Sequence, residues 1–189
     1  MKINQHWLTG ITRTPSPNFD DRPDPADISL LVIHCISLPP GEFDNPYIDR
    51  LFCNQLNPAD HPYFLEIHQL TVSAHLLIKR DGECVQYVPF NKRAWHAGKS
   101  TYEDRERCND FSIGIELEGT EWVDYTDKQY EQLAAVIRIL LATYPKLSTQ
   151  RITGHSDIAP GRKTDPGISF DWQRLLDLLQ LQTTVVRRE

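Results

Sequence analysis

Long apolar runs are missing from this sequence of 189 residues. No stretch approaches the ~20 apolar residues that a membrane-spanning helix requires, and residues 1–7 have no apolar core of a secretory signal. We therefore expect a cytoplasmic protein with no membrane partner. Basic residues are also few, since 20 Lys and Arg stand against 26 Asp and Glu and the net charge is −6. This charge argues against a nucleic-acid partner, because phosphate contacts need a basic surface.

Disulfide scaffolds and several catalytic signatures are missing as well. The four cysteines show no Cys-x-x-Cys pair and no scaffold spacing, so we expect free thiols in a reducing compartment. No G-x-S-x-G, H-E-x-x-H or G-x-G-x-x-G motif occurs. Candidate chemistry must therefore come from histidines, carboxylates and lysines placed together by the fold.

The length and composition fit one globular domain. Hydrophobic residues make up 40% and charged residues 24% of the chain, which is ordinary globular usage. With no repeat or linker in sight, we expect a single domain over residues 1–189. The proline-rich residues 1–28 predict an extended lead-in. Residues 36–62 predict a long irregular loop over a cleft, because long structureless segments are typically functional loops or lids.

Strand and helix patterns predict a layered α/β arrangement. Residues 29–34 form a continuous apolar run, typical of a strand covered on both faces. Residues 74–78 and 84–88 flank Asp81-Gly82, a hairpin signal. Residues 111–118 alternate strictly between apolar and small or acidic side chains, and residues 151–153 predict a short last strand.

Two helices are expected in the second half of the chain. Thr126 and Gln129 have the spacing of a capping box, and apolar residues follow at helical intervals up to Tyr144, before Pro145. A last helix carries Trp172 and several leucines, and Ser169 is its expected N-cap.

Two of the seven histidines stand where a ligand would be useful. His34 ends the buried strand, and ligands gather at strand ends in open α/β sheets. His155 opens a loop that also carries Lys163 and Asp165. Two imidazoles and a carboxylate suit zinc with one open position. Either histidine alone is better explained as a hydrogen-bonded structural residue. The same interpretation applies to the other five, although His75 and His96 belong near the cleft.

Glu116 is the most informative carboxylate. It lies opposite the apolar face of its strand, beside Ser112 and Gly114, which leave space above the sheet. A carboxylate there could take a proton from water and return it to a leaving amine. The alternative is a solvent-exposed strand face, which the neighbouring Glu118 also fits.

Lys163 and the basic residues around Trp95 have two interpretations each. Lys163 could place positive charge beside a developing oxyanion, or it is a solvated loop lysine. Trp95 offers an aromatic platform for a sugar or peptide. Basic residues around it suit a substrate with carboxylates or need no special explanation; they are Arg93, Lys99, Arg105 and Arg107.

Five segments together resemble the zinc-dependent N-acetylmuramoyl-L-alanine amidases, and in particular the cytoplasmic branch that recycles cell-wall fragments. They are residues 31–40 (LVIHCISLPP), 72–75 (VSAH), 93–98 (RAWHAG), 109–119 (NDFSIGIELEG) and 153–167 (TGHSDIAPGRKTDPG). The resemblance covers nearly the whole chain in the same order. It implies a single domain with a central mixed β-sheet flanked by helices, as in peptidoglycan recognition proteins.

The resemblance also implies a set of site residues. His34, His155 and Asp165 match the ligands of one zinc ion. Glu116 matches the catalytic acid and base, and Lys163 the residue that stabilises the tetrahedral intermediate. By position, Trp95 and Arg107 match cleft residues that contact the sugar and the carboxylates of the peptide stem.

The implied substrate is a small anhydro-muropeptide, cut between the muramic acid lactyl group and L-alanine, in a pathway that influences β-lactamase induction. We expect a monomer. Two alternatives stay open: a peptidoglycan-fragment-binding protein without catalysis on the same fold, and a periplasmic amidase that acts on intact cell wall.

Overall fold

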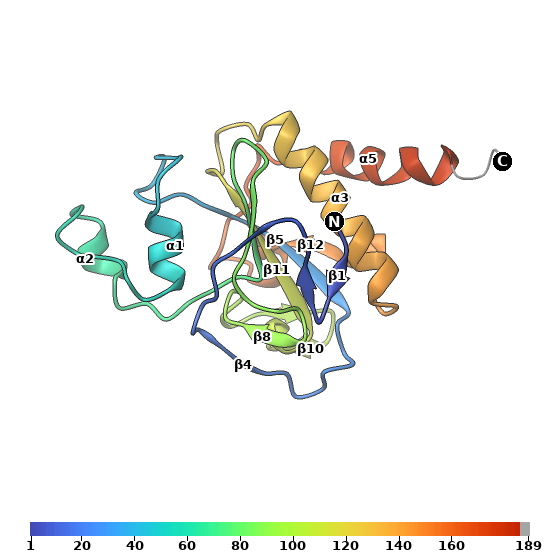
Figure 1. Ribbon diagram of the computed structural model, residues 1–189, viewed down its shortest axis with the longest axis horizontal. Helices are drawn as coiled ribbons and strands as arrows, with labels where there is room; N and C mark the ends of the chain where they lie inside the picture. Colours follow the sequence, from blue (N-terminus) through green and yellow to red (C-terminus); the bar gives the residue numbers. More distant parts are fainter. Residues whose placement is uncertain (186–189) are drawn as a thin grey trace.

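The two longest strands, β5 (Leu30–Ile36) and β11 (Ser112–Glu118), lie at the centre of a six-stranded sheet (Figure 1). The computed structural model describes residues 1–185. The strand order is β12-β5-β11-β6-β7-β3. The other four strands are β12 (Ile152–Gly154), β6 (Leu76–Ile78), β7 (Cys84–Gln86) and β3 (Thr12–Arg13).

The sheet is mixed, as the sequence predicts. Strands β12, β5, β11 and β6 run parallel, whereas β7 pairs with β6 in the antiparallel sense. That last pair confirms the hairpin expected around Asp81-Gly82, and β12 confirms the short last strand. Strand β3 then runs parallel to β7 at the edge.

One face of the sheet carries the main hydrophobic core. Helices α3 (Asp127–Thr143) and α5 (Trp172–Val185) cover this face (Figure 1). Their buried residues, including Leu133, Ile137 and Leu175, pack against Ile33 and Ile115. Burying one such aliphatic side chain contributes about 1.5–3 kcal/mol. The core therefore anchors both central strands from behind.

The N-terminal cap of α3 is as expected, but that of α5 is not. Thr126 accepts a hydrogen bond from the Gln129 backbone N–H, and the Gln129 side chain accepts one from the Thr126 N–H, which completes a capping box. Ser169 is not the cap of α5, because its hydroxyl donates to the Thr120 carbonyl. Asp171 takes this place, accepting a hydrogen bond from the Arg174 N–H.

Residues 1–28 are extended, as expected, yet they are closely joined to the rest of the fold. They form β1 (Ile3–Asn4), β2 (Trp7–Leu8), β3 and β4 (Phe19–Asp21), and β4 pairs with β8 (Lys92–Ala94). Polar side chains of this segment are buried, namely those of Ser16, Asn18 and Arg22. The segment is thus part of the packed structure.

Residues 36–62 are not wholly irregular, because they contain α1 (Tyr47–Phe52). With α2 (Phe64–Ile67), this helix forms a separate apolar cluster against Leu77 and Tyr87 (Figure 1). Local pattern did not reveal α1, since it is one and a half turns long and has no side-chain N-cap. The remaining short elements are β9 (Thr101–Tyr102), β10 (Arg105–Glu106), η1 (Cys108–Asp110), η2 (Thr149–Arg151) and α4 (His155–Ile158).

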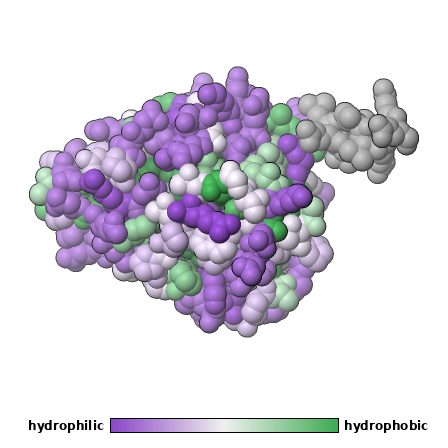
Figure 2. Space-filling model, in the orientation of Figure 1, coloured by the Kyte–Doolittle hydropathy of each residue, from purple (hydrophilic) through white to green (hydrophobic). Residues whose placement is uncertain are grey.

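Surface features agree with the composition. On the face shown in Figure 2, hydrophilic residues dominate and hydrophobic ones lie in small separate groups. Within residues 1–185, no helix combines the length and apolar character needed to cross a membrane. All four cysteines are free, as expected. The expected domain was drawn to residue 189, and residues 186–189 lie outside the described part of the chain.

Candidate active site

The candidate residues meet where three parallel strands end. Residue His34 is in β5, Glu116 pairs with it from β11, and His155 directly follows β12. Because side chains of paired residues in adjacent strands point to the same face, the register alone places Glu116 beside His34. The face is the one opposite the α3–α5 core. Carboxyl ends of parallel strands are where open α/β sheets bind ligands.

Three of the predicted residues form a tight cluster. The His34 Nδ1, His155 Nδ1 and Asp165 Oδ2 atoms lie 3.0 Å from one another. All three residues are buried, with exposed fractions of 1%, 3% and 8%. The backbone fixes the loop that carries the carboxylate, since the Ser156 N–H donates to the Asp165 carbonyl.

This donor set fits a divalent cation of the zinc type. Tetrahedral sites with bonds of about 2.0–2.1 Å hold their donors about 3.3 Å apart, close to the separation seen here. The second nitrogen of His155, Nε2, lies 3.1 Å from the Ala97 carbonyl and donates to it. The His155 Nδ1 lone pair is therefore free to point into the cluster, as a metal ligand requires.

The electrostatics of the cluster keep its donors ready for a cation. Burial lowers the pKa of His34 to about 4, although the Asp165 carboxylate opposes this shift. Burial alone would raise the pKa of Asp165, but its contacts with the His155 and His34 rings outweigh burial and lower that pKa below its usual range. A neutral imidazole and an ionised carboxylate follow, and both are the metal-binding forms.

Glu116 is buried next to this cluster without a partner of its own. Its Oε2 atom has no hydrogen-bond partner among the described residues. Burial raises the pKa of Glu116 well above its usual range, the Asp165 charge adds to this shift, and Lys163 opposes it. An unpaired buried carboxyl oxygen costs about 1–3 kcal/mol, and a buried carboxyl with a strongly raised pKa beside a cavity is a candidate for acid–base chemistry.

Glu118, two residues further along the same face, differs in kind. It is 1% exposed, so the solvent-exposed alternative for this strand face is wrong. Its two carboxylate oxygens accept hydrogen bonds from the backbone N–H groups of Asp44 and Arg80. Glu118 is therefore a structural carboxylate, whereas the Glu116 Oε2 atom has no such hydrogen-bond partner within residues 1–185.

A cavity of about 520 Å³ opens over the cluster. Glu116, Lys163 and Trp95 line it together with the three clustered residues, and Lys163 is exposed to it from the loop after α4. The opposite wall comes from residues 36–72 and is largely apolar; it includes Leu51, Phe52, Tyr63, Ile67 and Leu70. The volume suits a small molecule rather than a polymer.

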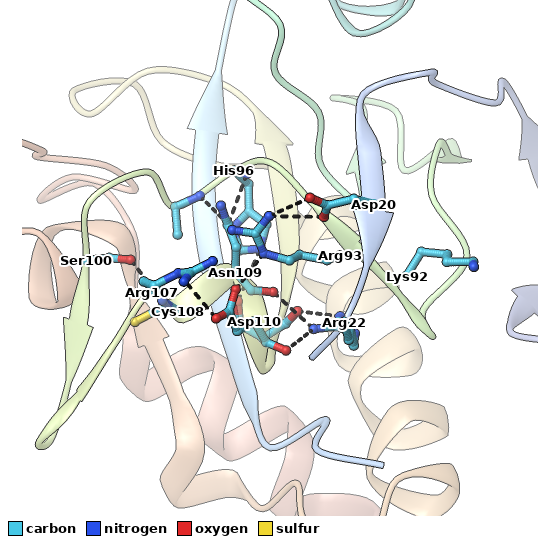
Figure 3. Close-up of polar contacts among 12 residues, drawn as sticks. Asp20, Arg22, Lys92, Arg93, His96, Ser100, Arg107, Cys108, Asn109 and Asp110 are labelled. Carbon is cyan, nitrogen blue, oxygen red and sulfur yellow. Dashed lines mark hydrogen bonds and ion pairs between the residues drawn. The ribbon is translucent and has the colours of Figure 1, made fainter. Parts of the chain in front are cut away.

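The basic residues around Trp95 are mostly engaged elsewhere. Arg107 does not line the cavity, and its exposed guanidinium lies 3.4 Å from an Asp110 oxygen. Arg93 forms ion pairs with Asp20 and Asp110 (Figure 3). Arg105 pairs with Asp27. The role of Arg107 in binding substrate carboxylates thus stays a prediction.

Sequence reasoning missed what occupies the space above Gly114. The ring of His96 fills it: a Cβ atom at position 114 would lie 2.4 Å from His96 Cγ. His96 also contacts His34, with 2.9 Å between its Nδ1 and the Nε2 of His34. The sequence placed His96 near the cleft, but no local pattern relates it to Gly114, because the two residues meet only through the packing of separate segments.

Comparison with known proteins agrees with this geometry. The sequence profile of the N-acetylmuramoyl-L-alanine amidase family matches residues 24–168. The chain is 61% identical over 184 residues to the 1,6-anhydro-N-acetylmuramyl-L-alanine amidase AmpD of Escherichia coli K12, covering 97% of this chain and all of that protein.

Solved structures give the same picture. A crystal structure of a selenomethionine derivative of AmpD superposes with a TM-score of 0.92 at 60% identity, covering 95% of this chain and 99% of that one. The amidase AmiD of Escherichia coli, in complex with the substrate anhydro-N-acetylmuramic acid-L-Ala-D-γ-Glu-L-Lys, gives a TM-score of 0.60 at 28% identity over 80% of this chain and 57% of that one. The chain belongs to the N-acetylmuramoyl-L-alanine amidase family.

Proposed function

We propose that this protein is a zinc-dependent amidase that cuts 1,6-anhydro-N-acetylmuramic acid from the L-alanine of muropeptides. The observation that carries the proposal is the buried cluster of His34, His155 and Asp165 beside the unpaired carboxyl of Glu116. The relatives support the substrate, since AmpD is named for this bond and AmiD was solved with an anhydro-muropeptide. The reaction belongs to peptidoglycan recycling in the cytoplasm, where it limits a fragment that influences β-lactamase induction.

His34, His155 and Asp165 would hold the zinc ion. Bound there, zinc supplies Lewis acidity, which polarises the scissile carbonyl and lowers the pKa of water toward ~7. With two neutral imidazoles and one carboxylate around zinc, the site would have a net charge of +1. That charge would favour oxygen atoms that carry negative charge.

Glu116 moves the proton. Hydrolysis forms a carbon–oxygen bond from water and breaks the carbon–nitrogen bond to alanine. Glu116 accepts one proton from the attacking water and delivers it to the alanine nitrogen, which otherwise would leave as an unstable amide anion. Its pKa, which burial raises well above the ordinary value, suits this exchange, because a more basic carboxylate takes up the proton of the attacking water more readily.

Lys163 and Trp95 act on the rest of the substrate. The Lys163 ammonium faces the same cavity as Glu116, and there it stabilises negative charge that develops on the carbonyl oxygen. The Trp95 ring offers a platform for the sugar. Arg107 lies further out, and we assign it to the carboxylates of a long peptide stem. A single chain contains all these residues, so we propose a monomer with one zinc ion.

The test is mass spectrometry of an anhydro-muramyl tripeptide incubated with the protein. We expect a free tripeptide with an alanine amine and a free anhydro-muramic acid, with release abolished by a chelator and restored by zinc. An intact substrate beside a folded, zinc-loaded protein would replace this proposal with a binding role.

A further inference from the structure

Each histidine of the cluster has a second ring nitrogen that faces the protein. His34 Nε2 lies 2.9 Å from His96 Nδ1, and the two rings meet edge to face at 5.0 Å. The other nitrogen of His96, Nε2, lies 3.2 Å from the Ser112 hydroxyl oxygen. His34, His96 and Ser112 therefore form a continuous chain of hydrogen bonds that leads away from the cluster.

Only one arrangement of protons along this hydrogen-bond chain leaves His34 able to bind a metal ion. For His34 Nδ1 to present a lone pair to a cation, its proton must sit on Nε2 and be donated to His96 Nδ1. The His96 proton then sits on Nε2 and is donated to the Ser112 oxygen. The reverse order would put a proton on His34 Nδ1 and block the ligand position.

The next residue does the same for the second histidine. The Ala97 carbonyl accepts the hydrogen bond of His155 Nε2. Ala97 is fully buried in an apolar cluster with Leu30 and Val32, and its carbonyl also accepts a hydrogen bond from Arg162 Nη2 at 2.7 Å. Two consecutive residues thus supply the outer hydrogen-bond acceptors for both imidazoles.

One side chain fixes this pair of residues. Asn109 Oδ1 accepts hydrogen bonds from the backbone N–H groups of His96 and Ala97, at 3.2 and 2.8 Å (Figure 3). Asn109 is buried, and its own carbonyl accepts a hydrogen bond from the buried Arg22 guanidinium (Figure 3). Gly114 admits the His96 ring, as no residue with a Cβ could.

We propose that His96 and Asn109 are positioning residues for the metal site: the segment 96–97, held by Asn109, sets the tautomer and ring orientation of both histidine ligands. The proposal rests on the proposed function in one respect, that His34 and His155 bind zinc. Neither residue needs to touch substrate. Outer partners of this kind typically change metal affinity about 10–100-fold when removed.

The test is the zinc dissociation constant of the full chain, measured by competition with a chromophoric chelator. We expect His96→Ala to weaken zinc binding about 10–100-fold. His96→Asn places an amide oxygen near the position of Nδ1 and should restore most of the affinity. His6→Ala is the matched control, because it removes a partly buried histidine that bonds to the Tyr144 hydroxyl away from the site.

Asn109→Ala is the second variant, in case His96→Ala fails to fold, and it should weaken zinc binding in the same range. Imidazole ¹⁵N NMR of the zinc-free protein adds a readout of the tautomer: His34 should be protonated on Nε2 in wild type and mixed in His96→Ala. If His96→Ala and Asn109→Ala both bind zinc with wild-type affinity, this inference is overturned and the proposed function stands. A wild-type protein that binds no zinc would overturn the proposed function and this inference with it.

Discussion

The two walls of the cavity are built in different ways. One wall is the carboxyl edge of β5, β11 and β12, where backbone ladders hold His34 and Glu116 at a fixed register. The other wall is residues 36–72, which contain only the short helices α1 and α2. The comparison teaches that His34 and Glu116 stand on the rigid wall, whereas the apolar contacts come from a segment with its own small core.

The two walls are joined through a carboxylate of the rigid one. Glu118 extends from β11 and accepts the Asp44 N–H of the second wall. On the same strand face, Glu116 makes no such bond. Glu118 thus supports the fold, whereas Glu116 is the carboxyl to which we assign proton transfer.

The largest effect should come from Glu116→Gln. We expect turnover to fall about 100–10,000-fold, since the amide cannot accept and return the proton, while zinc content stays at the wild-type level. Metal analysis and the initial rate on an anhydro-muramyl tripeptide measure both. Turnover within a few-fold of wild type would remove Glu116 from the mechanism.

Asp165→Ala should act on the metal itself. The variant loses one of three ligands, so its zinc affinity should fall by more than the about 10–100-fold that loss of an outer partner costs. Competition with a chelator measures this affinity. The neighbouring variant Asp157→Asn is unsuitable as a control, because the Asp157 side chain caps α4. Asp104→Ala is a better control, because Asp104 is exposed and does not line the cavity. Equal zinc affinity in Asp165→Ala would exclude it as a ligand.

Lys163→Met should have an intermediate effect. Removing one group that stabilises an oxyanion costs about 3 kcal/mol in other enzymes, or roughly 100-fold in kcat. We expect the loss in kcat rather than in KM, because the charge on the oxygen exists only in the transition state. Lys99→Met, another exposed lysine beside the site segment, serves as the control. A change confined to KM would instead assign Lys163 to substrate binding.

The smallest effect on turnover should come from Glu118→Gln. The amide leaves one of two backbone N–H groups without an acceptor, which should destabilise the fold by about 1–3 kcal/mol. Because Asp44 is one of these partners, amide exchange should accelerate in residues 36–62 more than in β5. Denaturant unfolding and exchange by mass spectrometry measure the two. Uniform acceleration across both segments would mean that Glu118 does not hold the second wall.

Much of the rigid wall could be predicted from sequence, because its elements follow local periodicity. The apolar run before His34 predicts a strand covered on both faces, and the strict alternation around Glu116 predicts a strand with one apolar face. The capping box at Thr126 predicts the helix behind them. The candidate ligand set follows only from the family resemblance, because no spacing in the chain relates His34 to His155. Their proximity depends on the pairing of β5 with β12, which is a long-range contact.

Three other features of the site and fold could not be predicted, because they depend on contacts between residues far apart in the sequence. Gly114 predicted an open space, but a residue eighteen positions earlier fills it with an imidazole ring. Ser169 had the right chemistry for a cap, but its hydroxyl bonds to Thr120 in the fold. Arg93 looked free to bind an anion until the fold supplied Asp20 and Asp110 as partners.

The most direct test of the account is a zinc titration of metal-depleted wild-type protein, with amide cleavage followed at each addition. The account predicts no cleavage without metal and a rate that rises linearly until one zinc ion per chain is bound, and then stays constant. Full cleavage by the metal-free protein, or a rate that ignores added zinc, would contradict it.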